Sequence, residues 1–284
     1  MLQKTLPTYE TLMRPLPRFS FKAWYYGLMN LSLRSLGRLS QGVKIGYKYG
    51  FDSGVMLEYV YRNQPSGITP IGKLIDWFYL NSQGWCGIRN RAELLKTTLR
   101  QTLQTHQQQG ITCVLLDVAC GGGRYDLEVL KQFPAESFRA TLRDYKPENV
   151  AKAQQLSDRL GVFANIEQAD AFSDADLDRV QPRPTIVLVS GLHEILPNDD
   201  LIRHHFQQLY RIMPSPSTLI FTIQPYHPQL ELIARVLPSH TGQPWVMRLR
   251  SWPLIQQWAT AAGFKNLRVQ MEPNGIFGVV TAQK

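Results

Sequence analysis

Short apolar runs alternate with amphipathic segments through the second half of the chain. Residues 114–116 form a β-branched and aliphatic run, as in a strand buried on both faces, and a helical pattern follows at 124–133. Further strands are predicted at 138–145, 165–169, 185–190, 218–224, 267–272 and 276–282. Apolar residues at helical spacing predict helices at 147–160, 199–212, 230–237 and 253–262. This alternation predicts an α/β fold, a doubly wound, mostly parallel sheet of seven strands that ends in an antiparallel hairpin through residues 273–275.

The first 110 residues carry helical patterns instead. Residues 1–18 contain three prolines and predict irregular structure. One amphipathic helix is predicted for 19–44, with Tyr25 and Leu28 on its apolar face and Arg34 and Arg38 on its polar face. Further helices are predicted at 57–62, 71–80 and 91–109. The sequence therefore divides into a mainly helical N-terminal extension or lid at 1–110 and an α/β domain at 111–284.

A glycine turn follows the first predicted strand of the α/β domain. Asp117 ends the strand, and Gly121, Gly122 and Gly123 come directly before the helical segment. A dinucleotide fingerprint would need a third glycine where Asp126 stands, and a carboxylate there would repel a pyrophosphate. A phosphate-binding lysine is also missing from the turn. The turn suits a cofactor that carries an ammonium group and no phosphate.

This turn resembles the first motif of the class I S-adenosylmethionine-dependent methyltransferases, which reads acidic-x-Gly-x-Gly-x-Gly. Here it runs from Asp117 to Gly123, with Ala119 in the place of the first glycine. The resemblance implies a Rossmann-like fold, with S-adenosylmethionine as cofactor and S-adenosylhomocysteine as product. It also implies a pre-domain that covers the cofactor and shapes the substrate pocket.

Polar residues at the ends of the following strands fit the same cofactor. Asp144 lies about twenty residues beyond the glycines, where a carboxylate can accept hydrogen bonds from two ribose hydroxyls. In the family, an acidic residue at the position of Asp170 meets the adenine amino group, and an apolar neighbour stacks on the ring. The predicted cofactor-binding residues are Asp117, Ala119, Gly121, Gly123, Arg124, Asp144, Tyr145, Asp170, Ala171, Phe172 and Ser190.

Three short motifs before the glycine turn carry a narrower resemblance. They are GFDSG at 50–54, YRNQP at 61–65 and GWCGIR at 84–89. Together they resemble a bacterial family described as putative methyltransferases, of which some members are fused behind an α/β-hydrolase domain. The chain has no GxSxG elbow, so we expect the stand-alone form. The resemblance implies methyl transfer, and its hydrolase association points to lipid or ester metabolism.

Candidate catalytic residues follow the fourth and fifth strands. His193 and Glu194 come after residue 190, at the edge where the family places the transferred methyl, and His227 follows the next strand. His193 is the first candidate for a general base or substrate-orienting group. The alternative is a hydrogen-bonded structural histidine. The predicted substrate-binding residues are Tyr226, His240, Arg248 and Arg250. Arg248 and Arg250, with His240, would hold an anionic group such as a phosphate or carboxylate; the alternative is that the two arginines are solvated loop residues. No metal-ligand spacing is visible.

All of the excess positive charge precedes the α/β domain. The net charge is +9; residues 1–110 hold 14 Lys or Arg against 5 Asp or Glu, and residues 111–284 hold 17 of each. This asymmetry indicates an anionic partner, either a membrane surface or nucleic acid. The basic segment 19–44, with Trp24, Tyr25 and Tyr26, suits the headgroup region of a bilayer, unless it packs on its own domain.

These observations predict a methyltransferase that acts on a small molecule or a lipid-like substrate, with peripheral contact to an anionic membrane. No apolar run reaches about 20 residues, and three cysteines are too few for a disulfide framework, so we expect a cytoplasmic protein. The basic segment 19–44 would place it peripherally on the inner membrane surface. An RNA methyltransferase and a non-catalytic cofactor-binding or scaffolding domain are the alternatives. No Asn-Pro-Pro-aromatic motif follows residue 190, so nucleic acid is the less favoured partner.

Overall fold

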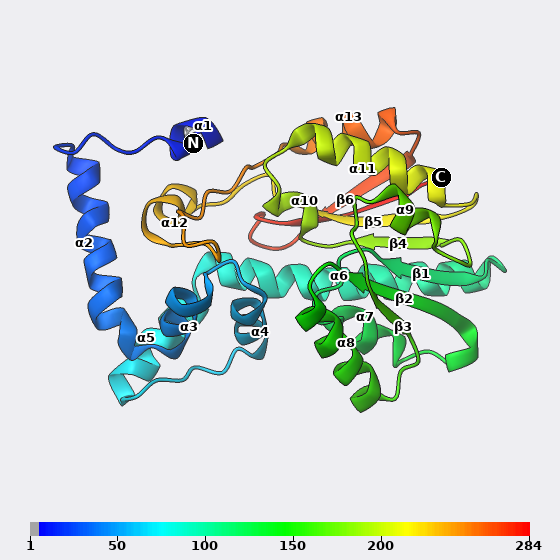
Figure 1. Ribbon diagram of the computed structural model, residues 1–284, viewed down its shortest axis with the longest axis horizontal. Coiled ribbons are helices and arrows are strands. Elements are labelled where there is room, and N and C mark those ends of the chain that lie inside the picture. Colours follow the sequence, from blue (N-terminus) through cyan, green and yellow to red (C-terminus); the bar gives the residue numbers. More distant parts are fainter. Residues whose placement is uncertain (1–5) are drawn as a thin grey trace. The chain divides into compact units, whose positions relative to one another are not determined.

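A seven-stranded sheet forms the centre of the α/β part in the computed structural model, which describes residues 6–284 (Figure 1). The strands are β1 (Cys113–Asp117), β2 (Phe138–Asp144), β3 (Asn165–Gln168), β4 (Ile186–Val189), β5 (Thr218–Ile223), β6 (Lys265–Met271) and β7 (Gly278–Gln283). Their order is β3-β2-β1-β4-β5-β7-β6. The first five strands are parallel, and β7 is antiparallel to β5 and β6. This confirms the predicted doubly wound sheet with its antiparallel hairpin.

Helices cover both faces of this sheet because successive strand side chains point to opposite sides. Leu115 packs with α6 (Gln83–Gln108), α7 (Arg124–Leu130) and α8 (Pro147–Leu160). Its neighbour Leu116 packs with α9 (Asp174–Asp178), α11 (Asp199–Ile212) and α13 (Trp252–Ala261). The strand order reverses between β1 and β4, and ligands of such sheets bind at the carboxyl ends of the strands there.

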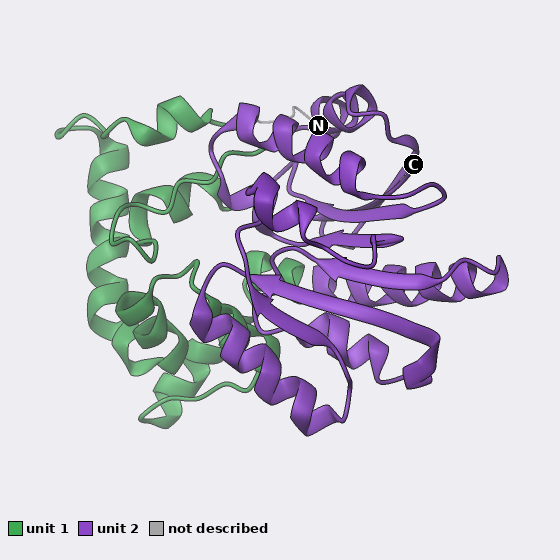
Figure 2. Ribbon diagram, turned by 45° about the vertical axis from the view of Figure 1, so that its right-hand side comes forward, with its two compact units in different colours: residues 1–89, 227–249 green, residues 90–226, 250–284 purple. Residues whose placement is uncertain are grey.

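The chain forms two compact units, which Figure 2 colours separately. Unit 2 comprises Asn90–Tyr226 and Arg250–Lys284, and unit 1 comprises the described residues up to Arg89 together with His227–Leu249. These are not the continuous segments 1–110 and 111–284. The boundary falls within α6, because Leu95, Leu99 and Leu103 of that helix pack on the sheet. The excursion that follows β5 packs with the N-terminal helices instead, as Met247 does with Leu12.

Unit 1 is helical and is organised around one buried carboxylate. Its helices are α1 (Tyr9–Met13), α2 (Phe21–Ser35), η1 (Leu36–Leu39), α3 (Gln41–Tyr49), α4 (Gly54–Arg62), α5 (Pro70–Leu80) and α12 (Leu230–Val236), with the start of α6. Asp76 of α5 accepts hydrogen bonds from the Ser40 hydroxyl at 2.5 Å and the Tyr59 hydroxyl at 2.5 Å. The backbone N–H groups of Gly42 and Ser66 also donate to it. One carboxylate thus holds α3, α4, α5 and a loop together.

Two N-terminal predictions need correction. The helix predicted for 19–44 is three elements, because Ser40 is buried on Asp76 and caps α3 by accepting from the Val43 N–H at 3.1 Å. The segment 1–18 is not wholly irregular, since Thr8 caps the short helix α1, whereas residues 1–5 lie outside the described part. Within residues 6–284, no helix combines the length and apolar character that crossing a bilayer requires.

Candidate active site

The turn after β1 uses two glycines for different reasons. Gly121 and Gly123 have φ values of +58° and +66°, in the left-handed region that favours glycine. A Cβ on Gly123 would lie 3.2 Å from side-chain atoms of Leu127 and Leu142, so this glycine permits close packing of helix on strand. A Cβ on Gly121 would have no atom within 4 Å. Gly121 therefore presents bare backbone to open space, where a ligand can approach.

The carboxylate at the end of β2 fixes this turn. Asp144 accepts hydrogen bonds from the Gly121 N–H, the Lys146 N–H and the Asn149 side chain at 2.9, 2.9 and 3.0 Å. A carboxylate has about four acceptor sites. About one acceptor site of Asp144 is therefore left, which is enough for one ribose hydroxyl and not for the two that the sequence suggested. Tyr145 follows as an exposed side chain, and its carbonyl accepts from Gln168 at the end of β3.

Two buried carboxyl groups lie under the glycine turn. Asp117 ends β1 and accepts from the Ala119 N–H at 2.9 Å, so it shapes the turn directly. Asp126 stands in the first turn of α7 and is fully buried beside Asp117, so the two carboxyl groups interact directly. Burial raises the pKa of Asp117 to about 7, and burial with the nearby charge of Asp117 raises that of Asp126. Asp126 was noticed in the sequence only as a group that would repel phosphate.

The remaining predicted cofactor residues lie around the ends of β1, β3 and β4. Asp170 is exposed and accepts from the Phe172 N–H at 2.9 Å, while Ala171 is buried. The half-buried Phe172 ring lies 4.5 Å from the His205 ring, centre to centre. Arg124, at the start of α7, pairs with Glu128 at 3.3 Å. Ser190 is half-buried at the end of β4, directly before a left-handed Gly191.

The two residues that follow Gly191 and Leu192 have different environments. The His193 ring is buried, and its Nε2 lies 2.8 Å from Nδ1 of His205. Burial, followed by the positive charges of His205 and Arg250, holds the pKa of His193 well below its usual range. Both carboxylate oxygens of Glu194 are shielded from solvent and have no hydrogen-bond partner within residues 6–284. Such a group gains from any ligand that donates a hydrogen bond to it.

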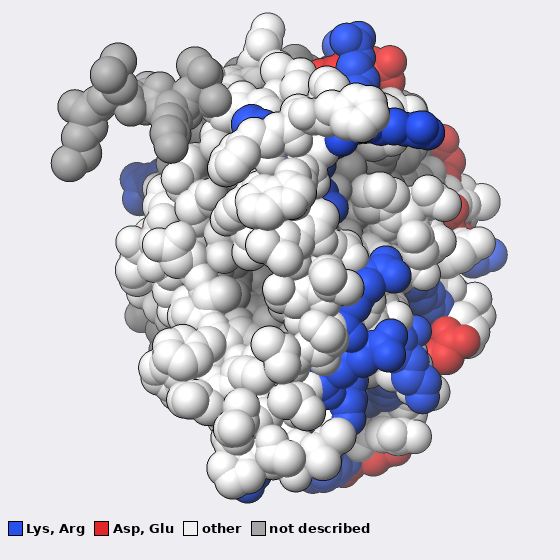
Figure 3. Space-filling model, turned by 90° about the vertical axis from the view of Figure 1, so that its left-hand side faces the viewer, with Lys and Arg blue, Asp and Glu red and all other residues white. Residues whose placement is uncertain are grey.

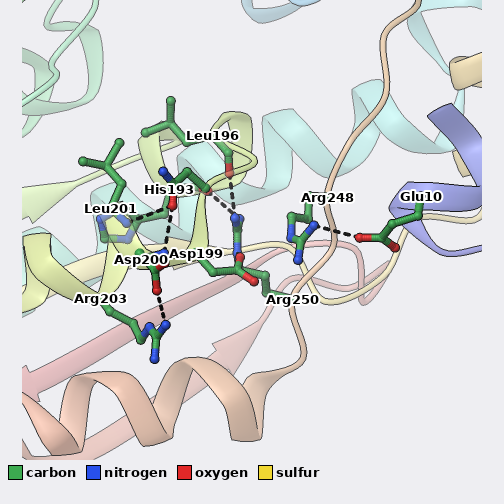
Figure 4. A network of polar contacts seen from close by, with 10 residues as sticks. Glu10, His193, Leu196, Asp199, Asp200, Leu201, Arg203, Arg248 and Arg250 are labelled. Carbon is green, nitrogen blue, oxygen red and sulfur yellow. Dashed lines mark hydrogen bonds and ion pairs between the residues drawn. The ribbon is translucent and has the colours of Figure 1, made fainter.

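Arg250 and Arg248, which with His240 are predicted to hold an anionic group, have different partners inside the protein. The buried guanidinium of Arg250 donates to the Asp199 carboxylate at 2.8 Å and to the carbonyls of His193 and Leu196 at 2.9 and 2.6 Å (Figure 4). It thereby closes the C-terminal end of α10 (Leu192–Ile195) and holds the start of α11. Arg248 belongs to unit 1, where it pairs with Glu10 at 3.0 Å (Figure 4).

The other predicted residues are divided between the units. His227 and His240 belong to unit 1, and Tyr226 is exposed at the end of the first segment of unit 2. His227 is buried, its Nδ1 accepts from the Gln229 N–H at 3.1 Å, and burial lowers its pKa to about 4. A Cβ at Gly84 would lie 2.9 Å from Nε2 of His227, which explains the first glycine of the GWCGIR motif. The His240 ring lies 2.8 Å from the Asp52 carboxylate, which explains the aspartate of GFDSG.

Arg91 is a residue near the site that the sequence did not single out. Its guanidinium is buried 4.9 Å from the Phe277 ring centre, and a Cβ on Gly191 would lie 3.6 Å from it. It therefore brings a positive charge to the carboxyl end of β4. In the sequence Arg91 is only the first residue of the helix predicted at 91–109. Arginines are also common on exposed helix surfaces, so its position alone could not indicate a role in the site.

The sheet order, the glycine turn with bare backbone at Gly121, and the carboxylates at the ends of β1 and β2 define a class I S-adenosylmethionine-dependent methyltransferase. The site fits this cofactor because Asp144 can accept a hydrogen bond from a hydroxyl beside the turn, and the turn from 117 to 123 contains no lysine to bind a phosphate. The chain belongs to the family described as "Putative methyltransferase", whose sequence pattern matches residues 2–284.

Two similar proteins match most of the chain. The Escherichia coli protein YnbC, described as uncharacterized, is 40% identical over 260 residues, which are 90% of this chain and 44% of YnbC. The chain thus spans less than half the length of this curated relative. A possible exported protein from Bordetella parapertussis has a TM-score of 0.65 at 17% identity, with 97% of this chain and 92% of that chain covered.

A methyltransferase with a bound product is also similar. Magnesium protoporphyrin IX methyltransferase from Synechocystis, solved with S-adenosylhomocysteine, has a TM-score of 0.54 at 12% identity and covers 85% of this chain and 99% of its own. At these identities the structural likeness shows the fold alone. The association with an α/β-hydrolase stays a prediction.

Proposed function

We propose that the protein methylates a hydroxyl or amino group of a small, lipid-like acceptor, with Glu194 as the general base. The observation that carries this proposal is the environment of Glu194. Its two carboxylate oxygens are hidden from solvent without a hydrogen-bond partner within the described residues, three positions after the left-handed Gly191 at the end of β4. A buried carboxylate without a hydrogen-bond partner favours a ligand that donates a hydrogen bond to it.

The chemistry asks little more of the protein than alignment and proton removal. S-adenosylmethionine, when bound, supplies an electrophilic methyl group on a sulfonium. The protein must hold the acceptor in line with that methyl group, and orientation alone can contribute a large part of the rate. Glu194 takes the proton of the acceptor, which matters for a hydroxyl or an ammonium. His193 is less suited to this task, because its Nε2 is engaged with His205.

The lipid-like character of the acceptor is supported by unit 1. This unit exposes large apolar side chains on α2 and α5, among them Trp24 and Phe78. An RNA partner would also fit a basic segment, yet RNA is bound through phosphate contacts and base stacking, not through exposed leucines and isoleucines such as Leu31 and Ile71. We place the protein in the cytoplasm, on the inner membrane surface, as part of the same proposal.

The test supplies labelled methyl donor to the purified protein with the lipid and the aqueous fraction of a bacterial extract, kept apart. We expect label in the lipid fraction with the wild-type protein. Glu194→Gln keeps the shape but not the basicity, so transfer should fall by about 100-fold or more. Affinity for S-adenosylhomocysteine should stay within about twofold, because Glu194 acts on the acceptor. Full activity of E194Q would reject the base, and label in the aqueous fraction alone would reject the lipid-like acceptor.

A further inference from the structure

Helix α2 is apolar on two sides, and only one of them is used inside the protein. Its inner side carries Met29 and Leu33, and Asn30 donates to the carbonyl of Val236 at 3.0 Å. No residue of α2 is fully buried. The outer side repeats large apolar residues at helical spacing with high exposed fractions: Phe21 (77%), Trp24 (65%), Leu28 (49%) and Leu31 (63%).

Helix α5 repeats this arrangement within the same unit. Gly72, Asp76 and Leu80 face inward and are buried. Ile71, Leu74, Trp77 and Phe78 are exposed on the other side. We call the exposed apolar side chains of these two helices the α2–α5 face, namely Phe21, Trp24, Leu28, Leu31, Ile71, Leu74, Trp77 and Phe78. A set of this size is far more than the scattered surface apolar residues of a protein that stays in water.

The charges of unit 1 select an anionic partner. Its described residues include 12 Lys or Arg and 5 Asp or Glu. Four of these acids pair with a cation or a histidine of the unit: Glu10 with Arg248, Asp52 with His240, Glu58 with Arg62 and Glu231 with Lys22. The fifth, Asp76, is buried. The excess positive charge of this unit is therefore left for an outside partner.

The apolar and basic features meet on one side of unit 1. Figure 3 looks onto the side that carries α2 and shows a broad area without Lys, Arg, Asp or Glu, bordered on one side by Lys and Arg. Aromatic side chains such as tryptophan, tyrosine and phenylalanine, next to a row of Lys and Arg, are suited to the headgroup region of an anionic bilayer. A second copy of the chain fits less well, because it would bring an equally positive unit to the same place.

We infer that the α2–α5 face docks on the surface of a bilayer that contains anionic lipid, as a peripheral contact that does not cross it. Leu, Ile and Phe side chains enter the boundary between headgroups and acyl chains, and nearby basic residues such as Arg38 and Lys73 attract the anionic headgroups. The inference deepens the proposed function, because a membrane-bound enzyme meets lipid-like acceptors. Docking is measured without turnover, so its failure is distinct from a failure of methyl transfer.

The test is co-sedimentation of the full chain with vesicles of phosphatidylcholine alone or with an equal part of phosphatidylglycerol. We expect binding to the anionic vesicles that is at least about tenfold stronger and that weakens at about 0.5 M salt, because exposed charges are screened there. The triple variant W24S/L28S/L31S should lose at least about tenfold in affinity, since it removes apolar contacts that only the bilayer makes.

Matched controls separate docking from general stickiness. Phe163 is 90% exposed in unit 2, so Phe163→Ser should bind like the wild-type protein. Arg38→Glu should weaken binding, whereas Arg159→Glu, on the exposed surface of unit 2, should not. Equal retention of the triple variant, or equal binding to neutral vesicles, would overturn the inference. Self-association that W24S abolishes, without vesicle binding, would assign the face to a second copy and reject the membrane.

Discussion

The imidazoles of His193 and His205 form a buried pair, with Nε2 of the first 2.8 Å from Nδ1 of the second. Burial lowers the pKa of both rings, to about 3 for His205, so both are neutral near pH 7, and one ring donates while the other accepts. The pair joins α10 to α11. This is the environment of a structural histidine, the alternative to a catalytic base, and it gives a measurable distinction between the two roles.

We expect His193→Ala to lower the free energy of unfolding by about 1–3 kcal/mol, because His205 is left buried without its partner. His205→Ala should do the same, and the double variant should cost less than the sum of the two. Urea unfolding of the four proteins measures the coupling. A catalytic role would give a different result: unchanged stability in His193→Ala with transfer reduced by about 100-fold.

Replacing each of the two positive-φ glycines of the turn with alanine should have different effects: one mainly on cofactor affinity and the other mainly on stability. Gly121→Ala has open space for its methyl, so the free energy of unfolding should fall by only about 1 kcal/mol from the backbone strain. Its methyl occupies the ligand's approach, and affinity for S-adenosylhomocysteine should fall at least about tenfold. Isothermal titration measures this affinity. Unchanged binding would mean that the cofactor does not approach the backbone at this glycine.

Gly123→Ala carries the same backbone strain but meets Leu127, Leu142 and Ala153 at 3.2–3.3 Å. Its loss of unfolding free energy should therefore exceed that of Gly121→Ala by about 1–3 kcal/mol. Thermal and urea unfolding of the two variants, side by side, check this difference. Equal stability would show that the helix shifts away from the strand without cost.

Arg250 and Arg248 offer a second matched comparison. Arg250→Met should lower the free energy of unfolding by about 2–4 kcal/mol, because Asp199 and two carbonyls lose their donor in a buried place. Arg248→Met loses an ion pair with a largely exposed Glu10, and pairs of that kind contribute about 0–1 kcal/mol. Equal losses in urea unfolding would contradict the structural role of Arg250.

The sequence was most informative where local signals agree with the packing. The predicted helices at 147–160 and 199–212 match α8 and α11. Helix α8 begins with a proline, and Asn198 caps the start of α11, so each helix begins where the apolar spacing begins. The strands β1, β4 and β5 followed from the same logic, since they are apolar runs that are fully buried, as suits a sheet covered on both faces.

It was least informative where a side chain reaches a distant partner. Ser40 breaks the predicted helix 19–44 because of Asp76, and Arg250 is occupied by carbonyls more than fifty residues earlier in the chain. His193 and Glu194 lie side by side on a helix of four residues, too short for apolar spacing to reveal which of them faces the core. No periodicity could therefore rank the two as candidate bases.

The buried Asp117 and Asp126 should give the protein an unusual dependence on pH. Their carboxyl pKa values are raised in the folded state, to about 7 for Asp117, so the folded protein holds a proton that the unfolded chain releases near pH 4. The contribution of these groups to stability is complete below pH 4 and is lost as the pH rises towards 7. His193 and His205 act oppositely, because their lowered pKa values cost stability as the pH falls below about 6.5.

Asp126→Asn isolates the carboxyl contribution, because the amide has the same size and never ionises. We expect it to raise the free energy of unfolding at pH 8 by on the order of 1 kcal/mol relative to the wild-type protein, and to change it little at pH 4. Urea unfolding at pH 4, 6 and 8 measures the difference, and the histidine contribution cancels between the two proteins. A variant that is less stable than the wild type at pH 8 would show that the ionised carboxylate of Asp126 is needed, and that the two acids do not repel each other across the turn.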